Sequence, residues 1–121
     1  MTTATTGEID MALNVYLRNT EGQNLYTSTI SASLKSMAEE LCIGCLIWYP
    51  RDYFDKKEIL AKELIHRLEI GITELALNPS YYGQLQLTGR EGSWEDLLLF
   101  CIRYMQACKD FPNAIVKTDH S

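Results

Sequence analysis

The stretch Met11-Ala-Leu-Asn-Val-Tyr-Leu-Arg18 decides between two folds for this chain. Its apolar and polar residues alternate, which is the pattern of a strand with one buried face. On that interpretation it is the first strand of a β-hairpin over residues 10–30. The same residues also fit a short helix that begins with a Thr5-x-x-Glu8 capping signal, and few of them are β-branched. We therefore expect a helix here and keep the hairpin as the alternative.

Three further segments carry apolar residues at helical spacing, over residues 31–49, 55–77 and 93–109. Asp55-Lys56-Lys57-Glu58 has the pattern of a capping box, and Ser93 is a good N-cap residue. Residues 42–49 also fit a buried strand, because a short apolar run before Pro50 suits either structure. We expect an all-α or predominantly α fold, a compact bundle of three to four helices. The alternative is an α+β fold in which the hairpin 10–30 packs on three helices.

The length and composition indicate one globular domain. The chain has 121 residues, of which 46% are hydrophobic and 22% are charged, without repeats or low-complexity tracts. We expect a single domain over residues 1–121, with flexible tails at 1–6 and 118–121. The formal net charge is −5, and the basic residues at 51–67 alternate with acidic ones. Nucleic acid and anionic membrane are therefore excluded as primary partners, because both require a basic surplus.

The start of the sequence and its apolar runs indicate the cellular compartment in which the protein is expected. Residues 1–10 lack the basic and apolar regions of a secretory signal. The longest apolar run, 42–49, is far shorter than the roughly 20 residues of a membrane helix. Four cysteines without a secretory signal favour reduced thiols. These features predict a cytoplasmic protein that does not enter the membrane.

The cysteines allow three interpretations. Cys42-x-x-Cys45 would be a redox pair if a strand preceded it and a helix dipole lowered a thiol pKa, but its flanks are apolar. Together with Cys101 and Cys108, the pair would supply four sulfur ligands for a structural zinc ion. The helical spacing directs all four thiols inward. We expect them to be small core residues, and zinc binding is the alternative.

The segment Asp96-Leu97-Leu98-Leu99-Phe100 resembles part of the MazG-like nucleotide pyrophosphohydrolases. This resemblance implies an all-α fold in which carboxylates on facing helices hold Mg²⁺. The carboxylates available here are Glu69, Glu74, Glu95 and Asp96. The chain has Ser93 where the family has a glutamate, and Glu39-Glu40 is followed by Ile43 rather than a third glutamate. The resemblance therefore implies a Mg²⁺-dependent hydrolase or an inactive relative of one.

The remaining features favour binding over catalysis. The two histidines, His66 and His120, have no nucleophile close in sequence, so no catalytic set emerges. Aromatic residues lie near element ends, where tyrosine and tryptophan often anchor protein interfaces. The expected interface residues are Tyr49, Tyr53, Tyr81, Tyr82 and Trp94. We expect a small acidic protein-binding module, such as an inhibitor, immunity protein, adaptor or regulator, that needs no cofactor. Its partner is another protein, or a second copy in a homodimer.

Overall fold

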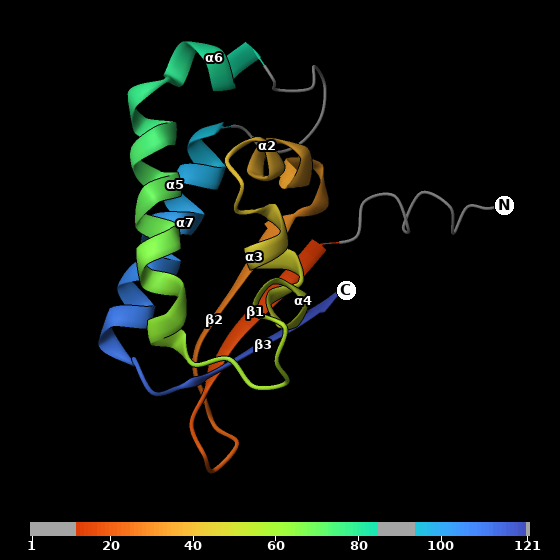
Figure 1. Ribbon diagram of the computed structural model, residues 1–121, viewed down its shortest axis with the longest axis vertical. Helices are drawn as coiled ribbons and strands as arrows, with labels where there is room; N and C mark the ends of the chain where they lie inside the picture. The colour runs from red at the N-terminus through yellow and green to blue at the C-terminus, as the bar shows by residue number, and fades with distance from the viewer. Residues whose placement is uncertain (1–11, 85–93, 121) are drawn as a thin grey trace, which may run out of the picture.

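The computed structural model describes residues 12–84 and 94–120, and Figure 1 shows the arrangement of its elements. Three strands form an antiparallel sheet in the order β2-β1-β3. The strands are β1 (Ala12–Arg18), β2 (Asn24–Ser31) and β3 (Ile115–His120). The helical segments are η1 (Ala32–Leu34), α2 (Lys35–Glu40), α3 (Gly44–Trp48), α4 (Pro50–Phe54), η2 (Ala61–Leu64), α5 (Ile65–Leu77), α6 (Pro79–Gln84) and α7 (Trp94–Asp110). The fold is α+β, so the expected all-α bundle is wrong and the hairpin alternative is confirmed.

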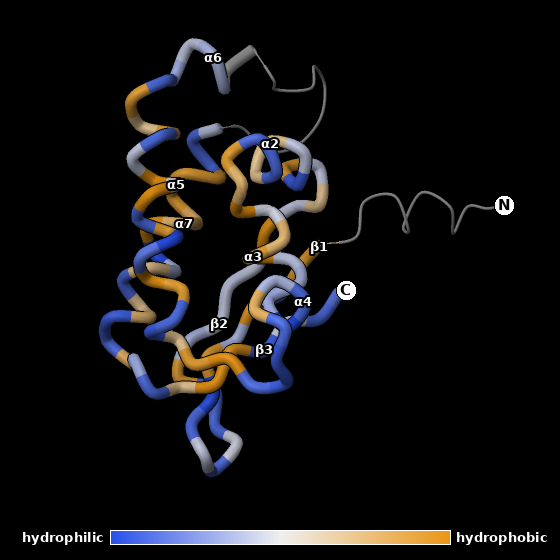
Figure 2. The backbone as a smooth tube through the Cα atoms, viewed as in Figure 1, coloured by the Kyte–Doolittle hydropathy of each residue, from blue (hydrophilic) through white to orange (hydrophobic). Residues whose placement is uncertain are grey.

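The central strand β1 has one completely buried face. Leu13, Val15 and Leu17 are fully buried, and the residues between them are only partly buried. β1 pairs with β2 on one side and with β3 on the other, so both of its edges are hydrogen-bonded. This pairing outweighs the shortage of β-branched residues, because strand propensity depends mainly on packing and burial. The hydrophilic connection between β1 and β2 projects from the bottom of the molecule (Figure 2).

The third strand lies where a C-terminal tail was expected. Residues 118–120 belong to β3, and Thr118 lies opposite Val15 of β1. The expected tail is therefore wrong for these residues. Residues 1–6, the other expected tail, lie outside the described part of the chain.

The expected helix 31–49 is divided into η1, α2 and α3. Cys42 has a left-handed backbone with φ of 62°, which ends α2 before α3 begins. A Cβ on Gly44 would lie 3.1 Å from the backbone of Glu39, so this close turn requires glycine. The strand alternative for residues 42–49 is also wrong, since most of them are helical.

The expected helix 55–77 begins later than its sequence pattern indicated. Asp55 is the C-cap of α4 in a left-handed conformation with φ of 55°, so it does not start a helix. Glu63 acts as the capping residue instead, because its carboxylate accepts a hydrogen bond of 2.9 Å from the Leu60 N–H. Partial burial alone would raise the pKa of Glu63. The Leu60 hydrogen bond and the Lys56 ammonium, 2.6 Å away, outweigh burial and lower that pKa. The expected helix 93–109 is confirmed as α7, and Ser93 lies outside the described residues.

Helices α5 and α7 lie side by side and pack over the sheet (Figure 1). The buried residues of strands and helices form one hydrophobic cluster. Tyr104 of α7 lies at the junction with the sheet, where its ring stacks on Tyr26 of β2 at 6.2 Å and contacts Phe100 at 5.6 Å. This contact places α7 alongside the edge strand β2.

Candidate binding surface

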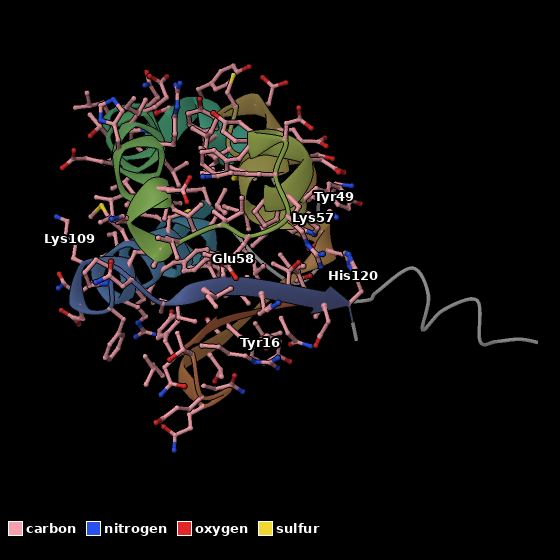
Figure 3. All side chains as sticks on the ribbon, turned by 60° about the horizontal axis from the view of Figure 1, so that its bottom comes forward. Tyr16, Tyr49, Lys57, Glu58, Lys109 and His120 are labelled. Atoms are coloured by element: carbon pink, nitrogen blue, oxygen red, sulfur yellow. The ribbon has the colours of Figure 1, made fainter. Side chains whose placement is uncertain are left out.

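The five aromatic residues expected at an interface do not form one exposed surface. Tyr82 is buried, and Tyr53 and Trp94 are half-buried against the core. Tyr49 and Tyr81 are exposed, but they lie on different elements and each already has an intramolecular partner. The Tyr49 hydroxyl accepts a hydrogen bond of 3.1 Å from Lys35. In Figure 3, Tyr49 and Lys57 lie on the helical side of the sheet, near the end of β3 at His120.

The tyrosine pair on α6 divides between surface and core. The Tyr81 hydroxyl donates a hydrogen bond of 3.0 Å to Glu40, and this bond raises the pKa of Tyr81. The Tyr82 ring meets the Tyr81 ring edge-on at 4.9 Å and is only 3% exposed. Burial raises the pKa of Tyr82, whose hydroxyl lies 3.4 Å from Glu74. Tyr82 therefore attaches α6 to the domain.

We expect Tyr82→Ala to lower the free energy of unfolding by about 3 kcal/mol, because it removes a buried aromatic ring. Tyr81→Ala is the matched control on the same helix, and the loss of one exposed hydrogen bond should cost less than about 1 kcal/mol. Urea denaturation followed by circular dichroism measures both values. Equal losses for the two variants would contradict the assignment of Tyr82 to the core.

The four cysteines lie in two different environments. Cys101 and Cys108 are buried in α7, as expected for core residues, and burial raises the pKa of each thiol to about 12. Cys42 and Cys45 are exposed, so the expectation that all four face inward is wrong for this pair. The left-handed backbone of Cys42 turns the chain away from the continuous helix on which that expectation depended. The structure therefore does not bring the four zinc candidates together.

The carboxylates expected to hold Mg²⁺ also differ in their surroundings. Glu74 accepts a hydrogen bond of 2.9 Å from the Asn78 side chain, and Glu69, Glu95 and Asp96 are exposed. Within residues 12–84 and 94–120, no group of three or more histidine, cysteine, aspartate or glutamate side chains is arranged to hold a metal ion. The sheet is a further departure from the all-α fold that the resemblance to MazG-like enzymes implies.

The outer face of the sheet is polar and satisfies its own hydrogen bonds. Thr29 donates to the Asn14 side-chain oxygen at 2.7 Å, and Asn14 donates to Asp119 at 2.8 Å. A hydrogen bond with Asp119 raises the pKa of Tyr16, and the Arg18 guanidinium lies 5.2 Å from the centre of the Tyr16 ring. Figure 3 shows Tyr16 on the side of the sheet away from the helices. This network across three strands is a solvated sheet face of the ordinary kind.

A groove of about 370 Å³ runs between β2 and α7. Three hydroxyl residues of β2 lie along one side, and residues of α7 lie along the other. The residues that line this β2–α7 groove are Ser28, Thr29, Ile30, Ser31, Leu34, Asp96, Leu99, Phe100 and Arg103. Leu99 is 45% exposed, and Ile102, one turn further along α7, is 41% exposed. The groove therefore combines polar hydroxyls, one charge of each sign and exposed apolar surface.

The backbone of β2 directs hydrogen-bonding groups away from the sheet beside this groove. The Val116 N–H donates to Ile59 outside the strand ladder, so Val116 directs its backbone away from Leu17, its partner on β1. Leu17 therefore directs its own N–H and C=O groups toward Tyr26, its partner on β2. Neighbouring residues of a strand direct these groups to opposite sides. By the same alternation, Thr27 and Thr29 direct their N–H and C=O groups toward the outer edge of β2. Among the described elements, no strand pairs with that edge.

Local sequence patterns do not point to this surface. Asp96 and Leu99 fall in the segment that resembles the MazG-like enzymes, and no pattern singles out Arg103. One signal was present, because Leu99 lies off the apolar face that helical spacing defines for α7. The position of the β2 edge depends on strand order, which no local pattern contains.

In the part that the structure describes, no helix has the length and apolar character needed to cross a membrane. Comparison of the chain with protein-family models, curated proteins and solved structures found no match.

Proposed function

We propose that this chain is a protein-binding module, of the inhibitor, immunity, adaptor or regulatory class, and that it binds partners through the β2–α7 groove. The observation that carries the proposal is the unprotected edge of β2 next to a groove that combines hydroxyl groups, one charge of each sign and the exposed side chain of Leu99. Edge strands that do not bind partners are usually blocked by charges, prolines or bulges. Residues 26–31 of β2 contain no charge and no proline, and their pairing with β1 is regular.

Strand addition is the binding mode that this geometry favours. An extended segment of a partner would hydrogen-bond to the outward N–H and C=O groups of Thr27 and Thr29. Its alternate side chains would enter the groove and contact Leu99 of α7, which lines it. Main-chain hydrogen bonds supply affinity in this mode, and the groove supplies specificity.

The test is a selection of 12-residue peptides from a random library on the immobilised protein. We expect the enriched peptides to bind the wild type and to lose at least tenfold in affinity for Leu99→Asp, as measured by fluorescence polarisation. Ile70→Asp is the matched control, since Ile70 on α5 is 47% exposed, close to Leu99 at 45%. It should leave affinity unchanged.

Circular dichroism must show that both variants remain folded. A library that yields no enriched peptide would overturn the proposal. So would peptides whose affinity is equally insensitive to Leu99→Asp and Ile70→Asp, because their binding would then lie elsewhere on the molecule.

A further inference from the structure

The β2 edge is compatible with pairing to itself. Antiparallel pairing of two β2 strands about Ser28 places Thr27 of one copy opposite Thr29 of the other. Both threonines direct their backbone groups outward, so each such pair exchanges N–H···O=C hydrogen bonds in both directions. Because residues 24–31 carry no charged side chain, this register brings no like charges together on the strands.

Helix α7 has a matching symmetry at the same level. Tyr26 stacks on Tyr104, which fixes how β2 and α7 lie relative to each other. Ser28 lies two residues beyond Tyr26, about 6.6 Å along the strand, which equals roughly four residues of helix. Since α7 runs opposite to β2 (Figure 1), the level of Ser28 corresponds to Phe100, which also lines the groove.

The charges of the groove lie symmetrically about that level. Asp96 and Arg103 both line the groove, and the midpoint between them falls between Leu99 and Phe100. A two-fold axis at Ser28 therefore brings Asp96 of each copy toward Arg103 of the other. The same axis brings the exposed side chains of Leu99 together, where they are removed from water.

We propose that the occupant of the β2–α7 groove is a second copy of this chain, which joins the two sheets into one six-stranded sheet through antiparallel β2 strands. This inference rests on the proposed function, because it names the partner at the same surface. The interface is isologous, with identical patches that meet across a two-fold axis.

Charge reversal tests the two-fold arrangement directly. Sedimentation equilibrium of the full chain at 5–200 μM, on the order of the concentrations at which weak dimers form, should show a monomer–dimer equilibrium. Asp96→Arg and Arg103→Glu should each weaken self-association at least tenfold, because each places like charges at both contacts. An equimolar mixture of the two variants should recover dimers, since every contact between unlike chains then joins opposite charges. A folding defect in either variant would not be repaired by mixing.

A second pair of variants tests the strand contact. Thr27→Pro removes an N–H group that points out of the sheet, so the pairing of β2 with β1 is kept. It should abolish dimers, and Thr27→Val, which keeps the N–H group, should not.

Three results would overturn the second copy as the occupant. They are a wild type that remains monomeric at 200 μM, dimers that persist in Thr27→Pro, and a mixture of charge variants that stays monomeric. If one of these results is found but the selected peptides still lose affinity for the Leu99→Asp variant, the groove binds a different protein and only this inference fails. If the peptides also fail, the proposed function fails with it.

Discussion

Replacing Tyr104 with alanine is expected to lower the free energy of unfolding by about 4–5 kcal/mol, a large part of the total for a domain of this size. Tyr104 is 1% exposed and is among the largest fully buried side chains. Its ring lies between Tyr26 of β2 and Phe100 of α7. The truncation therefore opens a cavity where the helix meets the sheet. Urea denaturation followed by far-ultraviolet circular dichroism measures the loss.

Tyr104→Phe is the matched control and should change the free energy of unfolding in the opposite direction. Within the described residues, the Tyr104 hydroxyl has no hydrogen-bond partner, and a buried unsatisfied polar group costs about 1–3 kcal/mol. Removing only this oxygen keeps the ring contacts, so we expect the free energy of unfolding to rise by about 1 kcal/mol. A loss of stability in Tyr104→Phe would mean that the hydroxyl is hydrogen-bonded in solution, contrary to this structure.

Alkaline pH is expected to destabilise the fold through the buried thiols of α7. Burial raises the pKa of Cys101 and of Cys108 from 9.0 to about 12. Unfolding returns each thiol to water, where its pKa is near 9, so the unfolded state releases protons first. The contribution of each thiol is fully present below pH 9 and is lost as the pH rises toward about 12. At pH 10.5 the two thiols together should lower the free energy of unfolding by about 4 kcal/mol.

Tyr104 adds to this effect, because burial raises its pKa well above 10. The measurement is urea denaturation under reducing conditions at several values between pH 8 and 10.5. Cys101→Ala with Cys108→Ala should flatten the dependence of stability on pH, whatever the variant does to stability at pH 8. Cys42→Ala with Cys45→Ala is the control at exposed positions and should leave the dependence unchanged. A wild type whose stability is constant up to pH 10.5 would contradict the burial of the α7 thiols.

Local patterns predicted some elements well and failed at others for identifiable reasons. Helix α7 has an uninterrupted apolar face and lies where its spacing placed it. The segment 31–49 has equally good spacing, but the left-handed residue Cys42 and the close approach of Gly44 to Glu39 divide it. Asp55 begins a sequence pattern typical of a helix N-terminus, yet it is the C-cap of α4. The spacing of apolar residues indicates which residues would share one face of a helix. The breaks in these helices depend instead on how neighbouring turns pack.

The candidate site was less predictable than the fold. Tyrosines near element ends suggested an interface, but Tyr82 is in the core and Tyr81 is hydrogen-bonded to Glu40. The β2–α7 groove combines residues about 70 positions apart, among them Thr29 and Leu99. Only strand order shows that β2 is an edge strand, and only its pairing with β1 shows which backbone groups point outward.

The sequence alone established the acidic charge, the amphipathic helices and the alternation in residues 11–18, because these are properties of composition and local spacing. It left that alternation open between a helix and a hairpin. Tertiary structure decided the choice by pairing β1 on both edges, with β3 arriving from about 100 residues away. The same long-range pairing made β2 an edge strand and placed α7 beside it. Hydrogen bonds and burial between distant segments are set by the folded chain as a whole, which is why the candidate surface exists only in the folded structure.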